Sequence, residues 1–413
     1  MPWRRGWRGV IPGGVSRAAQ FAVFFLVMVA VLGGMHFYIW ARLVKDPAFG
    51  DPWRRLLTVL LVAGAVAIPS SFFALRARST ALVEGFVFGA MMWMGISFLL
   101  FSALVVADAL RWAGTGAGAL WEWLRRVPDP PADPERRQFL ARAVAGGAAL
   151  AVGGASAVAL RSALAEPEVH EVPVRLERLP RALSGLTIAQ ISDLHVGPTI
   201  GERTVRRVVE ATNRLRPDLV AITGDLVDGS VPALAAAVAP LAGLRARYGV
   251  LFVTGNHEYY SGATAWLAHL RALGIRVLRN ERVEIGDGGT SIDVAGIDDW
   301  RSGGLAPGHG PDLPRALAGR DPDRSLVLLA HQPKGVEEAV QAGVELQLSG
   351  HTHGGQIFPF NLVTGLAYRY LAGLYSGVGP AGAGQVFVSR GTGYWGPPMR
   401  LGFPPEITRI VLG

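Results

Sequence analysis

The sequence predicts an α/β fold that follows an N-terminal helical transmembrane region. Two observations lead to this prediction. Four long apolar runs lie before residue 165, whereas the later apolar runs are short and alternate with helix-like segments. Several short runs end in Asp, Asn or His, and α/β folds place their sites at the carboxyl ends of strands. We therefore divide the chain into a membrane region, residues 1–165, and a soluble α/β domain, residues 166–413.

Composition and charge agree with this division. Hydrophobic residues make up 50% of the 413 residues and charged residues only 17%, a high apolar share for a soluble protein. Residues 1–165 contain 17 Lys and Arg against 8 Asp and Glu, whereas residues 166–413 contain 23 and 24. The net charge of +8 thus lies in the membrane region, and no nucleic-acid partner is expected for the folded domain. The lack of cysteine excludes disulfides and thiolate metal sites.

Three of the apolar runs are long enough to cross about 30 Å of hydrocarbon as a helix. They cover residues 18–40, 56–75 and 81–110, with charged residues only near their ends. After Arg111 the chain becomes rich in Gly and then in Pro, which predicts a surface loop before the fourth run. The lipid bilayer is therefore the expected partner of this region.

The fourth run, residues 139–160, consists mostly of Ala, Gly and Val. It follows Arg136 and Arg137, and this arrangement resembles a twin-arginine export signal with a possible cleavage site at 163–165. The alternative is that the two arginines are ordinary charges on the cytoplasmic flank of a span. Both interpretations place the loop before this run in the cytoplasm.

The distribution of Lys and Arg among the loops predicts the orientation, because these residues concentrate on the cytoplasmic side. The loop between the first two spans and the loop before the fourth contain ten. The N-terminal tail and the loop between the second and third spans contain six. We therefore expect a multi-pass protein of the cell (inner, cytoplasmic) membrane, with its C-terminal domain on the extracytoplasmic side.

In the C-terminal part, helices are predicted at residues 202–215, 231–244 and 263–273, among five short apolar strands. Each of these strands is followed by polar residues of the types that bind metal ions. They are Asp193 and His195, Asp225 and Asp228, Asn256 and His257, His331, and lastly His351 and His353. Strand ends that meet at one edge of a sheet would gather these side chains in one site.

The donors of this set are carboxylates, an amide and imidazoles, which suit Mn, Fe, Zn or similar divalent ions. Seven ligands from this set would exceed the needs of one ion and would suit two ions that share a bridging carboxylate. A two-metal centre is a common device for phosphoryl transfer, since it holds the attacking hydroxide and the phosphoryl oxygens together. A phosphoester is therefore the expected substrate.

Five ordered motifs resemble those of the calcineurin-like metallophosphoesterases. They are Asp193-x-His195, Gly224-Asp225-x-x-Asp228, Gly255-Asn256-His257-Glu258, His331 and Gly350-His351-x-His353. The resemblance covers residues 185–410 and extends, more narrowly, to a membrane-anchored bacterial branch with N-terminal transmembrane segments. It implies a four-layer α/β/β/α sandwich, two sheets face to face with helices outside. It also implies a metal-dependent phosphoric ester hydrolase that acts by attack of a metal-bound hydroxide.

Carried over position by position, the resemblance gives each motif residue a role. The first metal ion would be held by Asp193, His195 and His353. The second would be held by Asn256, His331 and His351, and Asp225 would bridge the two ions. His257 would act as a catalytic residue on the phosphoryl group, while Asp228 would orient a ligand or His257, or serve only the structure.

Outside the motifs, the segment 389–400 is rich in Gly and aromatic residues. It contains Arg390, Tyr394 and Arg400, which we name as candidate substrate-binding residues for a phosphate or a lipid headgroup. A plain turn is an equal alternative for this segment.

Anchoring raises the effective concentration of membrane-surface molecules at the domain. The favoured substrate is therefore a phosphodiester or pyrophosphate of a lipid headgroup or envelope precursor, with small diesters, nucleotides and monoesters left open. Two other hypotheses are an inactive phosphoesterase-like receptor or sensor that binds a phosphorylated ligand, and a transporter fused to the enzyme. The complete ligand set disfavours the first, and the scarcity of charge within the spans disfavours the second.

Overall fold

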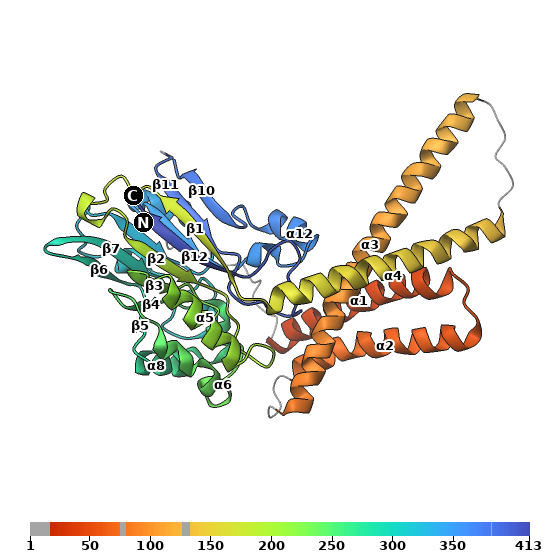
Figure 1. The fold of residues 1–413 in the computed structure, drawn as a ribbon, viewed down its shortest axis with the longest axis horizontal. Coiled ribbons are helices and arrows are strands. Elements are labelled where there is room, and N and C mark those ends of the chain that lie inside the picture. Colours follow the sequence, from red (N-terminus) through yellow and green to blue (C-terminus); the bar gives the residue numbers. More distant parts are fainter. Residues whose placement is uncertain (1–16, 75–79, 126–132, 381) are drawn as a thin grey trace. The chain divides into compact units, whose positions relative to one another are not determined.

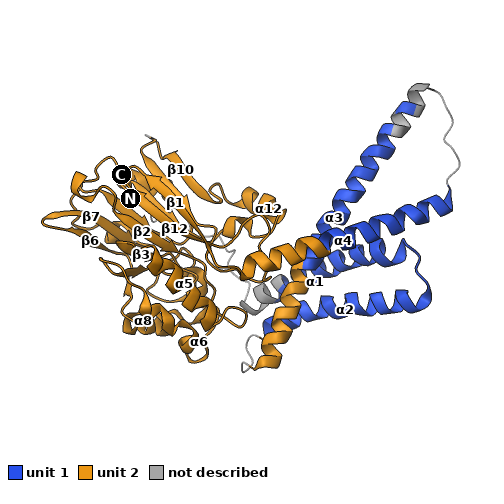
Figure 2. Ribbon diagram, viewed as in Figure 1, with its two compact units in different colours: residues 1–73, 96–152 blue, residues 74–95, 153–413 orange. Residues whose placement is uncertain are grey.

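The computed structural model describes residues 17–74, 80–125, 133–380 and 382–413 (Figure 1). These residues form two compact units, which we describe separately (Figure 2). One unit contains Met1–Phe73 and Ile96–Val152, and the other contains Ala74–Gly95 and Gly153–Gly413. The second unit thus includes parts of the apolar helices together with the whole α/β domain.

Among the described residues, four helices are long and apolar enough to cross a membrane, as the sequence predicts. They are α1 (Arg17–Trp40, which continues as the π-helical turn η1, Ala41–Lys45), α2 (Asp51–Ala74), α3 (Ala81–Arg125) and α4 (Pro134–Leu164).

Helix α3 is longer than the sequence analysis predicts. Residues 111–125, expected as a loop, continue the helix to Arg125. Ala, Leu, Trp and Glu among the glycines favour helix, and the first proline after this stretch is Pro128. Most of the proline-rich part of the expected loop, residues 126–132, lies outside the described residues.

The α/β domain contains two six-stranded mixed sheets. In the first sheet the strands are, in spatial order, β1 (Glu168–Val174), β12 (Glu406–Leu412), β2 (Thr187–Ile191), β3 (Leu219–Ile222), β4 (Val250–Phe252) and β5 (Arg276–Val277). In the second sheet they are β10 (Gly373–Val378), β11 (Gly384–Val388), β9 (Leu346–Ser349), β8 (Leu326–Leu329), β7 (Thr290–Gly296) and β6 (Glu281–Asp287).

Helices occupy the outer faces of both sheets and complete a four-layer sandwich. The longer ones are α5 (Glu202–Arg214), α6 (Val231–Val238) and α8 (Ala263–Ala272), whereas α12 (Phe360–Ala367), which has no buried residue, contacts the turn at 353–355. The shorter ones are α7 (Asn256–Ser261), α9 (Ser302–Leu305), α10 (Leu313–Ala316) and α11 (Val336–Gln341), with the 3₁₀ turns η2 (Arg181–Leu183), η3 (Ala239–Gly243) and η4 (His353–Gly355).

Three apolar clusters hold the layers together. The first lies between the first sheet and its helices and includes Val208 and Trp266. The second lies between the two sheets, where Leu219 and Leu346 belong to one buried cluster. In the third, Val336 of α11 packs on the outer face of the second sheet. The four-layer α/β/β/α arrangement implied by the resemblance is therefore confirmed.

The strands that carry the motifs are parallel neighbours within each sheet. Strands β2, β3 and β4 pair in parallel in the first sheet, and β8 pairs in parallel with β9 in the second. Their carboxyl ends therefore lie at one edge of each sheet, and short loops from that edge carry the polar residues to a common site.

Candidate metal centre

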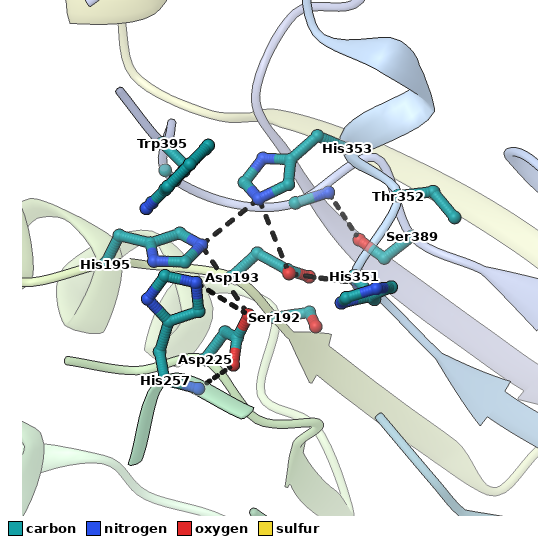
Figure 3. A network of polar contacts seen from close by, with 12 residues as sticks. Ser192, Asp193, His195, Asp225, His257, His351, Thr352, His353, Ser389 and Trp395 are labelled. Carbon is teal, nitrogen blue, oxygen red and sulfur yellow. Dashed lines mark hydrogen bonds and ion pairs between the residues drawn. The ribbon is translucent and has the colours of Figure 1, made fainter. Parts of the chain in front are cut away.

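Six of the seven candidate metal ligands, all but Asn256, form clusters at the carboxyl ends of the strands (Figure 3 shows most of them). Three groups of side chains have ligand atoms that all lie within 4.8 Å of one another. They are Asp193 with His195 and His353, Asp225 with His331 and His351, and His195 with Asp225 and His257. Asp225 thus belongs to two of the three groups, one with His195 and His257 and the other with His331 and His351.

The loops reach this arrangement through unusual backbone conformations. Asp193, His195, Asp225, His351 and His353 all have φ between 50° and 73°, in the left-handed region that non-glycine residues seldom adopt. Such conformations persist where the surrounding structure imposes them, and they concentrate at functional sites. Gly255 is required in turn, since a Cβ there would lie 2.1 Å from the Asp225 carboxylate.

The first group consists of two imidazoles, of His195 and His353, and the carboxylate of Asp193. His195 Nε2 lies 3.1 Å from His353 Nε2 and 3.9 Å from Asp225 Oδ2. His353 Nε2 lies 3.5 Å from Asp193 Oδ1. Burial and the charge of Arg400 hold the pKa of His353 well below its usual range, so its imidazole is neutral. A neutral imidazole is the form that binds a metal ion.

The second group shows the same pattern on the other side of Asp225. His331 Nε2 lies 3.0 Å from Asp225 Oδ2 and 3.2 Å from His351 Nδ1. Because the carbonyl of Thr223 only accepts, the 2.8 Å contact from His331 Nδ1 places a proton on that nitrogen and turns Nε2 toward Asp225. Burial and then His331 lower the pKa of His351 to about 3, so its ring is also neutral.

The chemistry of these donors fits metal ions. Asn256 Oδ1 is buried and has no hydrogen-bond partner, which is costly unless a cation binds it. It begins α7 and directly follows Gly255, which packs against Asp225 of the second group. Burial opposes ionisation of Asp225, but the surrounding histidines hold its pKa well below the usual range, so it is a carboxylate. A buried carboxylate, an orphaned amide oxygen and neutral imidazoles together form a site for divalent ions.

His257 and Asp228 lie next to the ligands and contact each other. His257 Nδ1 forms a short contact with Asp228 Oδ1, and its Nε2 lies 3.9 Å from Asp225 Oδ2. Asp228 Oδ2 also lies 3.2 Å from His195 Nδ1. Asp228 therefore holds a ligand and His257 at once. Burial alone would lower the pKa of His257, but Asp228 and Asp225 raise it to about 9.

Comparison with known proteins identifies the family. The calcineurin-like phosphoesterase family matches residues 186–355. A transmembrane protein with a metallophosphoesterase domain from Bos taurus is 37% identical over 410 residues, covering 94% of this chain and 88% of the relative. The chain belongs to the calcineurin-like metallophosphoesterases.

Other relatives of this metallophosphoesterase come from fish and bacteria. A protein of the same description from Danio rerio is 34% identical and covers 96% of this chain and 91% of its own length. An uncharacterized metallophosphoesterase from Helicobacter pylori is 38% identical over 280 residues, 68% of this chain and 73% of the relative. The predicted enzyme class, a metal-dependent phosphoester hydrolase, is confirmed, and the four apolar helices and the transmembrane relatives make it a membrane protein.

Three residues that the sequence analysis assigned to substrate binding have other partners in the metallophosphoesterase. Arg390 Nε donates to Glu406 at 2.6 Å. Tyr394 is buried, and its hydroxyl donates to the carbonyl of Thr199 at 2.9 Å. Arg400 is buried as well and donates to backbone carbonyls of its own loop, with Nη2 3.1 Å from His353 Nδ1. These contacts hold all three side chains against neighbouring parts of the protein, and their assignment to substrate binding stays a prediction.

Glu258 is a structural residue of the site to which the sequence analysis gave no role. Its two buried carboxylate oxygens accept from the backbone N–H groups of Gly255, Asp225, Leu226 and Val227, at 2.6, 3.0, 2.7 and 3.3 Å. One side chain thus holds the loop after β3 against the start of α7. Its place directly after His257 in the motif was the only sequence signal.

We expect Glu258→Ala to destabilise the protein by about 3 kcal/mol or more, because each buried donor left unsatisfied costs about 1–3 kcal/mol. The thermal unfolding midpoint of the full chain in detergent measures this loss. Glu210→Ala, which removes an exposed carboxylate from α5, is the control and should leave the midpoint unchanged. Equal midpoints for the two variants would contradict the role given to Glu258.

Tyr368 contacts a candidate metal ligand, and the sequence did not reveal this contact either. Its hydroxyl lies 2.8 Å from His351 Nε2, while Nδ1 of the same ring points to His331. A partner on the far ring nitrogen fixes the orientation of a metal-binding histidine. Tyr368 directly follows α12, 15 positions beyond the last histidine motif, and no spacing rule connects the two.

Tyr368→Phe should weaken metal binding at the second group by about tenfold, the usual effect of removing such a partner. Isothermal titration calorimetry of the metal-depleted full chain with Mn²⁺ measures the change in affinity. Tyr370→Phe removes a hydroxyl that binds Glu337 instead and should leave the affinity unchanged. An affinity unaltered by Tyr368→Phe would show that His351 is oriented without the hydroxyl.

Proposed function

We propose that this chain is a membrane-anchored phosphoesterase with a two-metal centre that hydrolyses phosphodiester or pyrophosphate bonds. The observation that supports this most directly is the position of Asp225 between two ligand groups, with His257 beside it. Two ions of Mn, Fe or Zn would be held by Asp193, His195 and His353 on one side and by Asn256, His331 and His351 on the other, with Asp225 shared. Bound divalent ions supply Lewis acidity that activates water and neutralises phosphoryl oxygens.

The side chains of this chain supply the remaining chemistry. His257 is protonated at neutral pH, because the carboxylates of Asp228 and Asp225 outweigh its burial. Its Nδ1 is engaged by Asp228, so the proton on Nε2 faces the space beside Asp225. From there it can stabilise charge on a phosphoryl oxygen or pass a proton to the leaving oxygen. The backbone N–H of His257 donates to Asp225 Oδ1 at 2.9 Å and fixes the two relative to each other.

We further propose that the substrate is a lipid headgroup or envelope precursor on the extracytoplasmic face of the cell membrane. Four apolar helices precede the domain, so molecules of the bilayer surface meet it at high effective concentration. Reporter fusions after Arg125 and after Ala165 test the orientation. We expect a cytoplasmic signal from the first and an external signal from the second. A cytoplasmic signal from the second would overturn the orientation, and with it the external substrate.

The activity itself is tested with the full chain purified in detergent. We expect Mn²⁺-dependent hydrolysis of bis(p-nitrophenyl) phosphate that exceeds hydrolysis of p-nitrophenyl phosphate and stops on chelation. A lipid pyrophosphate in mixed micelles then tests the substrate class against a soluble nucleotide. Preference for the monoester would overturn the diester assignment, and preference for the nucleotide would overturn the lipid assignment.

A further inference from the structure

Helix α12 exposes an unusual amount of apolar surface. None of its residues is buried, and Leu362, Val363 and Leu366 are 62%, 56% and 90% exposed. Phe358, just before the helix, and Phe360, its first residue, are exposed as well. We call Phe358, Phe360, Leu362, Val363 and Leu366 the α12 face. Soluble surfaces rarely group so many large apolar side chains, and such groups mark sites of interaction.

This helix is fixed to the rim of the metal centre. Tyr368, at its C-terminal end, contacts His351, and at its N-terminal end the chain comes directly from the loop of His353. Gly355 packs so closely against α12 that a Cβ there would lie 2.3 Å from the Cα of Asn361. The α12 face therefore moves with the site, and whatever binds it lies next to the site.

The segment before α12 is also joined to a loop that contacts two of the apolar helices. The N–H of Phe358 donates to the carbonyl of Leu401 at 3.0 Å. One residue earlier in that loop, the N–H of Arg400 donates to the carbonyl of Ala159 in α4 at 2.8 Å. The residue before Arg400 packs on α3, where a Cβ at Gly95 would lie 2.3 Å from Met399 Sδ. Both helices are candidate membrane spans.

We propose that the α12 face docks on the lipid bilayer that anchors the chain and holds the mouth of the metal centre at the membrane surface. Helix α12 contains no charged residue, and Asn361 and Thr364 are its only polar side chains. A short helix of this composition at a membrane boundary buries its apolar side chains among the upper parts of the acyl chains.

Two aromatic residues beside His257 agree with this position. Trp395 and Tyr260 are 46% and 54% exposed, and their rings lie 5.7 and 5.3 Å from the imidazole of His257 between centroids. Trp and Tyr concentrate at the level of lipid headgroups, because each has an apolar ring and a polar group. The docking goes beyond the proposed hydrolysis, since it holds for a lipid substrate and for a soluble one.

The absence of cysteine makes a direct test possible, because one introduced cysteine is the only one that can be labelled. We would place the fluorophore NBD on Leu366→Cys in the full chain, in lipid nanodiscs with and without spin-labelled phosphatidylcholine. The control is Asp323→Cys, exposed before β8 and thus at the opposite edge of the sheet from the site. We expect about twofold or stronger quenching at 366 by the spin-labelled lipid and none at 323.

The alternatives give different results. Blue-shifted fluorescence at 366 that the spin-labelled lipid does not quench would mean that a second protein copy covers the face, and would overturn bilayer docking. Fluorescence typical of water would overturn it too. Adding Leu362→Asp and Val363→Asp should abolish the quenching but leave hydrolysis of bis(p-nitrophenyl) phosphate within about twofold. The quenching and hydrolysis measurements test the two proposals separately. Docking can fail while hydrolysis persists, and hydrolysis can fail while docking persists.

Discussion

Replacing Asp225 by Asn is expected to reduce phosphoester hydrolysis by about a thousandfold or more, equal to about 4 kcal/mol of transition-state stabilisation. Asp225 Oδ2 lies 3.9 Å from His195 Nε2, a ligand of one group, and 3.0 Å from His331 Nε2, a ligand of the other. An amide has the size of a carboxylate but no charge, so both groups lose the anion that they share. The purified full chain, assayed with bis(p-nitrophenyl) phosphate at saturating Mn²⁺, gives the measurement.

Metal analysis distinguishes a loss of binding from a loss of folding. We expect Asp225→Asn to bind fewer than two Mn²⁺ ions per chain while its unfolding midpoint stays close to that of the wild type. Asp323→Asn makes the same chemical change at an exposed position and should retain full activity and metal content. An Asp225→Asn protein with two bound ions and undiminished hydrolysis would refute a shared carboxylate.

The sequence predicts that these side chains gather at one place because every candidate ligand follows a strand within four residues. Once β2, β3 and β4 pair in parallel in one sheet and β8 pairs with β9 in the other, the positions after them lie at one edge of each sheet. The apolar runs that mark the strands are fully buried, so hydrophobic pattern alone locates them. The helices at 202–215 and 263–273 are found by the same reasoning, within one residue of their ends.

Contacts between distant segments could not be predicted in this way. Arg400 is a cation in a Gly-rich loop, a pattern typical of phosphate binding, yet it is buried and bonded to carbonyls. Glu258 and Tyr368 act through loops brought together only by the tertiary structure. The length of α3 depends on helix continuing past Gly114 and Gly116, where local propensity favours a break. The exposure of the α12 face was not predicted either, because Phe, Leu and Val are residue types that are usually buried.

Replacing His257 by Gln is expected to separate proton transfer from metal binding. For an alkyl phosphodiester, whose leaving oxygen needs a proton, kcat should fall by about 10²–10⁴, the usual contribution of general acid catalysis. For bis(p-nitrophenyl) phosphate the loss should be much smaller, because nitrophenolate leaves without one. Both Mn²⁺ ions should remain, since His257 is not among the seven ligands that we assign. Loss of one ion would instead make His257 a ligand.

The pH dependence gives a second test of His257. The raised pKa keeps His257 protonated at neutral pH, so the wild-type rate on the alkyl diester should fall as the pH rises through that pKa. His257→Gln has no such proton and should lack this alkaline limb. Asp228 is one of the groups that raise the pKa, so Asp228→Asn should move the limb to lower pH. A limb that stays in place in both variants would belong to another group, and His257 would then act only by orienting the substrate.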